Sequence, residues 1–156
     1  MADHSHASEA DLKLGGSAGV RVLTHAQLQC IVVTPESTVL DEQVEFVALP
    51  LDDGEIGIAP GRAPMIGRLG YGELRLTASG QPKRYYVDGG FVQVAANVVS
   101  VLTNRAMPVE AIDKQLAAEH LAEARKRKAN SEELLTARDR LERQARAQLR
   151  VAARSR

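Results

Sequence analysis

The side chains best suited to chemistry lie in the segment 52–64, where charged residues are interspersed with glycines and prolines. Three carboxylates, Asp52, Asp53 and Glu55, cluster at its start, and Arg62 lies further along. Paired carboxylates can act as a general acid and base. Here, however, an Asp-Gly pair inside the cluster is a strong signal for a hairpin turn. The pattern therefore favours turn chemistry or a binding surface over catalysis.

Two prolines stiffen the second half of this segment. Pro60 and Pro64 each fix φ and remove an amide donor, so residues 59–64 can form neither a ladder strand nor the interior of a helix. The expected result is a stiff, exposed loop that presents Glu55 and Arg62 on either side of a bend. Stiff exposed loops of this kind usually bind a partner.

Outside this segment the chain offers no arrangement typical of catalysis, of phosphate binding or of a metal site. Cys30 alternates with apolar neighbours, which is typical of a small core residue rather than a nucleophile. His120 falls in an expected helix, where a lone histidine is usually structural or solvated. The pair His4 and His6 does not complete a metal-ligand set. The sequence predicts a protein that is not an enzyme on its own and that has no catalytic residues, metal or bound cofactor.

The composition describes an ordinary globular chain of 156 residues with few aromatics: no Trp, three Tyr and two Phe. The core must therefore be built from aliphatic side chains. A single cysteine suits a reducing compartment, and no apolar run approaches the ~18 residues of a membrane span. The chain reads as cytosolic. Its zero net charge divides into 8 basic and 12 acidic residues in 1–108, a charge of −4, and 12 basic and 8 acidic in 109–156, a charge of +4.

The secondary-structure signals change at the same point. Residues 1–24 are polar and aperiodic and predict a disordered tail. Residues 25–106 contain many short alternating apolar runs with turn residues between them, which is typical of a sandwich or barrel. The breaks include Gly70-Tyr71-Gly72 and Asp88-Gly89-Gly90.

Residues 107–156 predict two helices that fold back as a hairpin. The first is expected from Val109 to about Lys128, and the second follows a break at Asn130-Ser131, with Ser131 as its N-cap, and runs to about Ala152. The expected apolar stripes are thin and rich in alanine: Val109, Ile112, Leu116, Leu121 and Ala124 in the first helix, and Leu134, Leu141, Ala145, Leu149 and Ala152 in the second. Such a hairpin is marginal alone and needs a partner surface.

Four stretches, in this order and spacing, carry a family resemblance: Leu28–Glu36, Gly54–Pro64, Tyr86–Val94 and Asn97–Thr103. Together they resemble the ε subunit of F-type rotary ATP synthases, whose mitochondrial counterpart is called δ. The likeness runs from about Leu28 to Ala124. A histidine is common in the family where this chain has Arg62.

The resemblance implies an α+β fold, with a flattened antiparallel β-sandwich of about ten strands followed by a two-helix antiparallel hairpin. It further implies a central-stalk (rotor) subunit that couples γ to the c-ring for proton-driven ATP synthesis. In the family the helices can extend along γ and restrain ATP hydrolysis. The expected location is the cytoplasmic face of a bacterial cell membrane, reached only through the complex.

The resemblance also suggests roles for individual residues. Glu55 and Arg62 match positions that face the polar loops of the c-ring. Arg138, Arg143, Arg146 and Arg150 are expected to meet acidic surface on the catalytic α and β subunits once the helices extend.

Some bacterial members of the family bind ATP through a segment that reads Ile/Leu-Asp-x-x-Arg-Ala. Ile112, Asp113 and Ala117 match it here, but Leu116 stands where the arginine is expected. Because the cation that would meet a phosphate is missing, we expect weak or absent ATP binding.

Two other classes compete with this interpretation. A nucleic-acid-binding module could use the Arg-rich helices, but the strand-rich part is acidic and nearly lacks the aromatics that stack on bases. A sandwich enzyme acting on carbohydrates or small ligands would need paired carboxylates or a metal set, and neither is evident.

Overall fold

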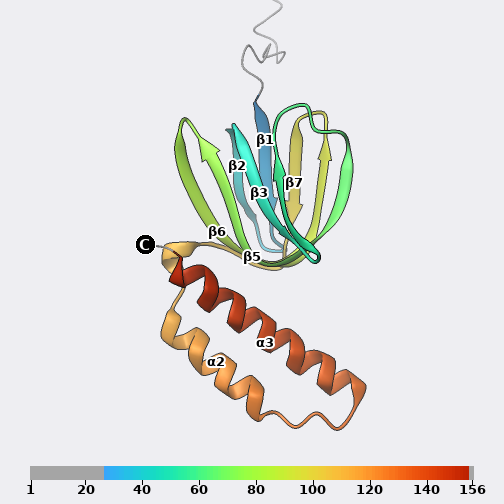
Figure 1. Cartoon of the computed structure of the whole chain (residues 1–156), viewed down its shortest axis with the longest axis vertical. Coiled ribbons are helices and arrows are strands. Elements are labelled where there is room, and N and C mark those ends of the chain that lie inside the picture. Colours follow the sequence, from blue (N-terminus) through green and yellow to red (C-terminus); the bar gives the residue numbers. More distant parts are fainter. Residues whose placement is uncertain (1–26, 155–156) are drawn as a thin grey trace, which may run out of the picture.

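The computed structural model describes residues 27–154, which form a strand-rich sandwich and a helical hairpin (Figure 1). The predicted tail 1–24 lies outside the described residues. The strands are β1 (Leu28–Val33), β2 (Thr38–Val44), β3 (Phe46–Leu51), β4 (Gly54–Ile58), β5 (Met65–Ala78), β6 (Gln81–Ala95), β7 (Val98–Leu102) and β8 (Ala106–Pro108). A 3-10 turn, η1 (Val109–Ala111), precedes α2 (Lys114–Lys126) and α3 (Glu132–Ala153).

One continuous sheet folds over on itself to make both layers of the sandwich. Its strand order is β2-β1-β7-β6-β5-β3-β4, and β8 pairs with β6 off this path. We call β2, β1, β7 and the halves of β6 and β5 beside them the first layer; the other halves of β5 and β6, with β3, β4 and β8, form the second layer. All pairings are antiparallel except β1 with β7. The aliphatic core between the layers includes Cys30, confirming its expected place.

The predicted fold class is confirmed, but residues 27–154 form eight strands rather than about ten. The two glycine-containing breaks do not end strands. They bend the long strands β5 and β6, so each of these strands contributes to both layers.

Gly90 shows why the bend needs glycine. Its φ is +113°, and a Cβ built there would lie 1.9 Å from the carbonyl oxygen of Leu102 on β7. No other residue has room for this approach. The chain can therefore bend at this point while β6 pairs with β7 from Phe91 onward.

The hairpin begins later than the sequence pattern suggests. Pro108 ends β8, and Asp113 is the N-cap of α2, its carboxylate accepting a hydrogen bond from the amide of Leu116 at 3.1 Å. The predicted helix from Val109 was wrong because an extended Ile112 separates η1 from α2. The predicted Ser131 N-cap is confirmed, its hydroxyl accepting from the amide of Leu134 at 3.2 Å. The connection between the helices is longer than the expected break at Asn130-Ser131, because α2 already ends at Lys126 rather than at about Lys128.

Helix α3 lies between the sandwich and α2, which packs on its outer side (Figure 1). Small side chains make the close contacts: Ala117 and Ala124 on α2, and Ala145, Ala147, Val151 and Ala152 on α3 are buried. Leu116 and Leu134, expected in the apolar stripes, are about half exposed. A second, smaller core joins Tyr86, Val109, Ala147 and Val151.

Candidate functional site

The loop 59–64 lies at one end of the sandwich and is tied to the β6–β7 turn. The amide of Gly61, whose φ is +87°, donates to Asn97 Oδ1 at 2.8 Å. The carbonyl of Asn97 in turn accepts from the amide of Gln29 at 2.8 Å. These two hydrogen bonds connect the loop to the start of β1. They add to the stiffness that the two prolines predicted for the loop.

The structure places Glu55 and Arg62 apart rather than on one bend. Glu55 lies in β4 and forms an ion pair with Arg75 of β5, both side chains being half exposed. Arg62 is exposed in the loop beyond the other end of β4. Gly54, next to Glu55, borders the groove lined by Arg143 and other α3 side chains. The predicted contact residues therefore belong to different ends of the sandwich, and their roles stay predictions.

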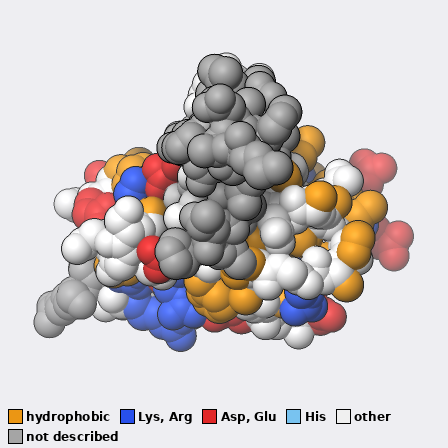
Figure 2. Space-filling view, turned by 90° about the horizontal axis from the view of Figure 1, so that it is seen from above, with side chains coloured by type: hydrophobic (Ala, Val, Ile, Leu, Met, Phe, Trp, Pro, Cys, Tyr) orange, Lys and Arg blue, Asp and Glu red, His pale blue; other side chains and the backbone are white. Residues whose placement is uncertain are grey.

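A face that the sequence reasoning missed lies on the outside of the first layer. Ile66, Phe91 and Leu102 are 75%, 54% and 56% exposed. Phe91 pairs with Leu102 across β6 and β7 and with Arg68 across β6 and β5, so these side chains are neighbours. We call Ile66, Phe91 and Leu102 the apolar face. Figure 2, a view of the sandwich from above, shows hydrophobic side chains at the surface among charged groups of both signs.

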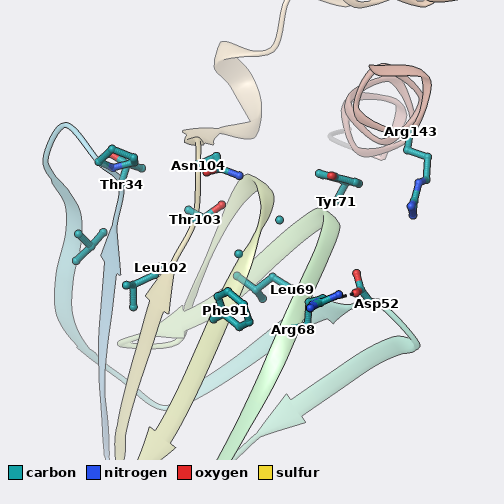
Figure 3. A pocket seen from close by; sticks show the side chains of 14 residues that line it. Thr34, Asp52, Arg68, Leu69, Tyr71, Phe91, Leu102, Thr103, Asn104 and Arg143 are labelled. Atoms are coloured by element: carbon teal, nitrogen blue, oxygen red, sulfur yellow. Dashed lines mark ion pairs between the residues drawn. The ribbon is translucent and has the colours of Figure 1, made fainter. Parts of the chain in front are cut away.

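A pocket of about 680 Å³ continues from this face toward the hairpin. In Figure 3, Phe91 lies beside Leu102, and Arg68 faces Asp52, with 3.8 Å between Arg68 Nε and Asp52 Oδ2. The Arg68 guanidinium also lies 5.9 Å from the centroid of the Phe91 ring. The sequence could have revealed this apolar face through Phe91. Because successive side chains of a strand point to opposite faces and Val92 is buried, Phe91 must face outward.

The four arginines predicted to contact a partner are all on α3, but they do not form one face. Arg143 lies 5.8 Å from the centroid of the Tyr71 ring, and Arg150 donates to the Tyr71 carbonyl at 3.4 Å. Arg146 is paired with Glu142 at 3.5 Å. Arg138 instead donates to the carbonyl of Arg127 at the hairpin connection, at 3.4 Å. Arg143, Arg146 and Arg150 together line a groove at the end of the sandwich.

The segment that resembles an ATP-binding motif has structural uses in this chain. The Asp113 carboxylate caps α2, and Ala117 is buried between the helices. Ile112 packs against the smaller core. Leu116 is about half exposed and offers no charge to a phosphate.

Within residues 27–154, no three His, Cys, Asp or Glu side chains come together in a way that would hold a metal ion. Burial in the sandwich core, with Glu42 and Asp41 nearby, raises the pKa of the Cys30 thiol to about 12, so it is a poor nucleophile. Over the same residues, no helix has the length and apolar character needed to cross a membrane.

Comparison with known proteins decides the family. Residues 27–109 match the family described as "ATP synthase, Delta/Epsilon chain, beta-sandwich domain", which is more than half of the chain. The chain belongs to this ATP synthase delta/epsilon family. The family predicted from the sequence is thus confirmed, and the alternative interpretation as a nucleic-acid-binding module gains no support.

Similar proteins agree with this assignment. The chain is 53% identical over 125 residues to an ATP synthase epsilon chain of Rhodopirellula baltica, covering 80% of this chain and 98% of that one. It is 45% identical over 96 residues to an ATP synthase epsilon chain of Desulfitobacterium hafniense, covering 60% and 73%.

Among solved structures, a chain of the Euglena gracilis mitochondrial ATP synthase aligns with a TM-score of 0.64 and 26% identity over 82% of this chain and 78% of that chain. A chain from the Tetrahymena thermophila mitochondrial ATP synthase central stalk and c-ring aligns with a TM-score of 0.65 at 12% identity, covering 80% and 96%, which bears on the fold alone.

Proposed function

We propose that this delta/epsilon-family chain is a non-catalytic rotor subunit in the central stalk of an F-type ATP synthase. It would couple γ to the c-ring for proton-driven ATP synthesis at the cytoplasmic face of a bacterial cell membrane, which it reaches only through the complex. The observation that carries this proposal is the combination of an exposed apolar face with a braced loop on one stiff sandwich. A subunit that transmits torque needs two attachment surfaces held rigidly relative to each other.

The apolar face is the surface we assign to γ. Contiguous exposed apolar side chains on a small domain usually mark a protein interface, and an aromatic ring at its centre suits an anchoring contact. Arg68 at its rim, close to Phe91 and Asp52, can supply orientation without a large desolvation cost.

The loop 59–64 is the surface we assign to the polar loops of the c-ring, with Arg62 as the exposed cation. Because the prolines and the bond from Gly61 to Asn97 already fix the loop, docking would cost little further conformational entropy. Glu55 is a weaker candidate for this contact, since its carboxylate is paired with Arg75 and lies further along β4.

The hairpin is proposed to restrain ATP hydrolysis by leaving the sandwich and extending along γ. Its docking surface is built mainly from alanine and valine, so little apolar area is lost on release. Arg138, Arg143, Arg146 and Arg150 would then be available to acidic surface on the α and β subunits. We propose that ATP does not control this step in this chain, because Leu116 supplies no cation and Asp113 is engaged as an N-cap. Micromolar ATP binding in isothermal titration would overturn the proposal that ATP does not control release of the hairpin.

The assignment of surfaces is tested by adding full-length variants back to the cognate complex depleted of this subunit. Leu102→Glu should abolish binding to γ, whereas Arg62→Glu should bind γ normally but fail to restore ATP-driven proton pumping. Arg125→Glu, at an exposed arginine on α2, is the matched control and should behave as the wild type. Normal γ binding by Leu102→Glu, or normal pumping by Arg62→Glu, would refute the corresponding surface.

A further inference from the structure

A buried carboxylate lies where the sandwich meets α3. Asp88, just before the glycine corner of β6, is only 5% exposed, and the ion pairs formed among residues 27–154 do not include it. A buried carboxylate without a cationic partner is costly unless hydrogen-bond donors satisfy its oxygens. Its donors therefore show what holds this junction together.

The two oxygens of Asp88 are satisfied by different parts of the protein. Tyr86 Oη, from the same strand, donates to Asp88 Oδ1 at 3.0 Å. Gln144 Nε2, from α3, donates to Asp88 Oδ2 at 3.1 Å. Burial, together with Asp88, raises the pKa of the Tyr86 hydroxyl, and Gln148, one turn further along α3, acts in the opposite direction. The two glutamines are spaced i, i+4 and line the same pocket as Asp88, so one face of α3 is directed at the Tyr86–Asp88 pair.

The sandwich holds Asp88 in a fixed position. Its amide donates to Thr103 Oγ1 at 3.0 Å, and its carbonyl accepts from Asn104 Nδ2 at 3.2 Å. Tyr86 is fully buried beneath Val109, Ala147 and Val151. The acceptor is therefore pre-placed by the sandwich, and only α3 can move away from it.

The other contacts of α3 with the sandwich are mainly polar or involve small side chains. Arg143 lies over the Tyr71 ring of β5, and Arg150 donates to the Tyr71 carbonyl. The α3 side chains at the smaller core are small ones, Ala147 and Val151. At the far end, Arg84 Nη1 donates to the carbonyl of Arg154 at 2.8 Å while the same guanidinium holds Glu73. With so little apolar area, the polar contacts contribute a large part of the specificity of docking.

We propose that Asp88, Gln144 and Gln148 form a latch that holds the hairpin on the sandwich in one register. When α3 leaves, water solvates both Asp88 and Gln144, so the released state carries no unpaired buried charge. While α3 is docked, loss of the Gln144 donor leaves Asp88 Oδ2 without this hydrogen bond, and the Tyr86 hydroxyl still donates to Oδ1. The latch therefore makes docking selective for one arrangement and sensitive to a single hydrogen bond. These are positioning residues, and they take no part in any chemistry.

The test is hydrogen exchange measured by mass spectrometry on the full-length protein carrying Gln144→Glu. The substitution places a second carboxylate against Asp88 in the docked state only. We expect amides in the second half of α3 to exchange about ten- to a hundredfold faster, while β1 and β7 keep their protection. Gln115→Glu, the same change at an exposed position of α2, is the control and should leave exchange unchanged.

A reciprocal exchange distinguishes a latch from general damage. In the double variant Asp88→Asn with Gln144→Glu, the amide and the carboxylate change sides, and protection of α3 should return toward the wild-type level. Unchanged α3 exchange in Gln144→Glu would overturn the proposal. So would an equal loss of protection in β1 and β7, or a double variant that is no better than the single one.

The consequence for ATP hydrolysis rests on the proposed function. If the released hairpin is the inhibitory form, Gln144→Glu should inhibit the depleted cognate complex more strongly than the wild type does. Faster α3 exchange without stronger inhibition would uphold the latch and refute the proposed regulatory role. Unchanged exchange would refute the latch whatever the inhibition.

Discussion

Replacing Gly90 with alanine should damage this fold far more than replacing other glycines of positive φ. The added Cβ would lie 1.9 Å from the Leu102 carbonyl oxygen and 3.0 Å from Thr103 Cα, and both of these are backbone atoms that cannot rotate away. Relief requires β6 and β7 to separate by more than about 1 Å at the Phe91–Leu102 pair, and atoms in a close-packed interior lose much of their contact energy over such a gap.

The magnitude follows from two contributions. Holding a non-glycine residue at φ +113° costs on the order of 2 kcal/mol. Disturbing the packing of buried Val92 and Val101 beside the clash adds about 2–3 kcal/mol, as for other overpacked cores. The expected loss is thus about 4–5 kcal/mol, a large part of the ~5–15 kcal/mol that stabilises a typical domain.

The assay is urea unfolding followed by far-ultraviolet circular dichroism, with Gly80→Ala as the matched control. Gly80 also has a positive φ, +73°, but a Cβ there would meet nothing within 4 Å. Only the cost of the positive φ remains for Gly80→Ala, so its free energy of unfolding should fall by about 1–2 kcal/mol. Equal losses in the two variants, or a loss below about 2 kcal/mol for Gly90→Ala, would refute the idea that the close approach to Leu102 requires glycine.

Two further predictions concern buried polar groups. Arg84→Met should lower the free energy of unfolding by about 3 kcal/mol, because it leaves the nearly buried Glu73 without its two 2.7 Å hydrogen bonds. The control Arg146→Met breaks only a solvent-facing pair with Glu142 and should change the free energy of unfolding by less than about 0.5 kcal/mol in the same urea titration. Similar losses in the two variants would contradict a stabilising role for the Arg84–Glu73 pair. Cys30 should resist iodoacetamide at pH 8 in the folded protein and react on unfolding. Its pKa is raised from 9.0 to about 12, so the thiol loses its proton at lower pH in the unfolded chain than in the folded protein. The contribution of the protonated thiol to stability is therefore complete below pH ~9 and is lost as the pH rises from 9 toward 12. A Cys30→Ala variant whose stability has the same pH dependence would show that Cys30 is not its cause.

Local chemistry made much of the architecture predictable. Alternation of apolar residues identified the strand-rich part and placed Cys30 in its core, because a strand directs successive side chains to opposite faces. Ser131 followed by two glutamates marked the start of α3, since a cap is satisfied within one helical turn. The prolines of the loop 59–64 excluded regular structure there. The family emerged from four short stretches in order, and all of these signals are local in sequence.

Other features were decided by contacts between residues far apart in the chain. A glycine pair signals a change of backbone direction, but only the neighbouring strand decides whether the strand ends or bends, as at Gly90 against Leu102. The loop is fixed by Asn97, 36 residues beyond Gly61. Asp88 looked like a turn residue, yet it is a buried acceptor because Gln144, 56 residues later, lies above it. The sequence alone thus determined which part of the chain is strand-rich and which is helical, since propensity and periodicity act over a few residues, but it did not determine every boundary between elements. Only the tertiary structure decided which polar groups are buried together, because burial depends on what the rest of the chain places against them.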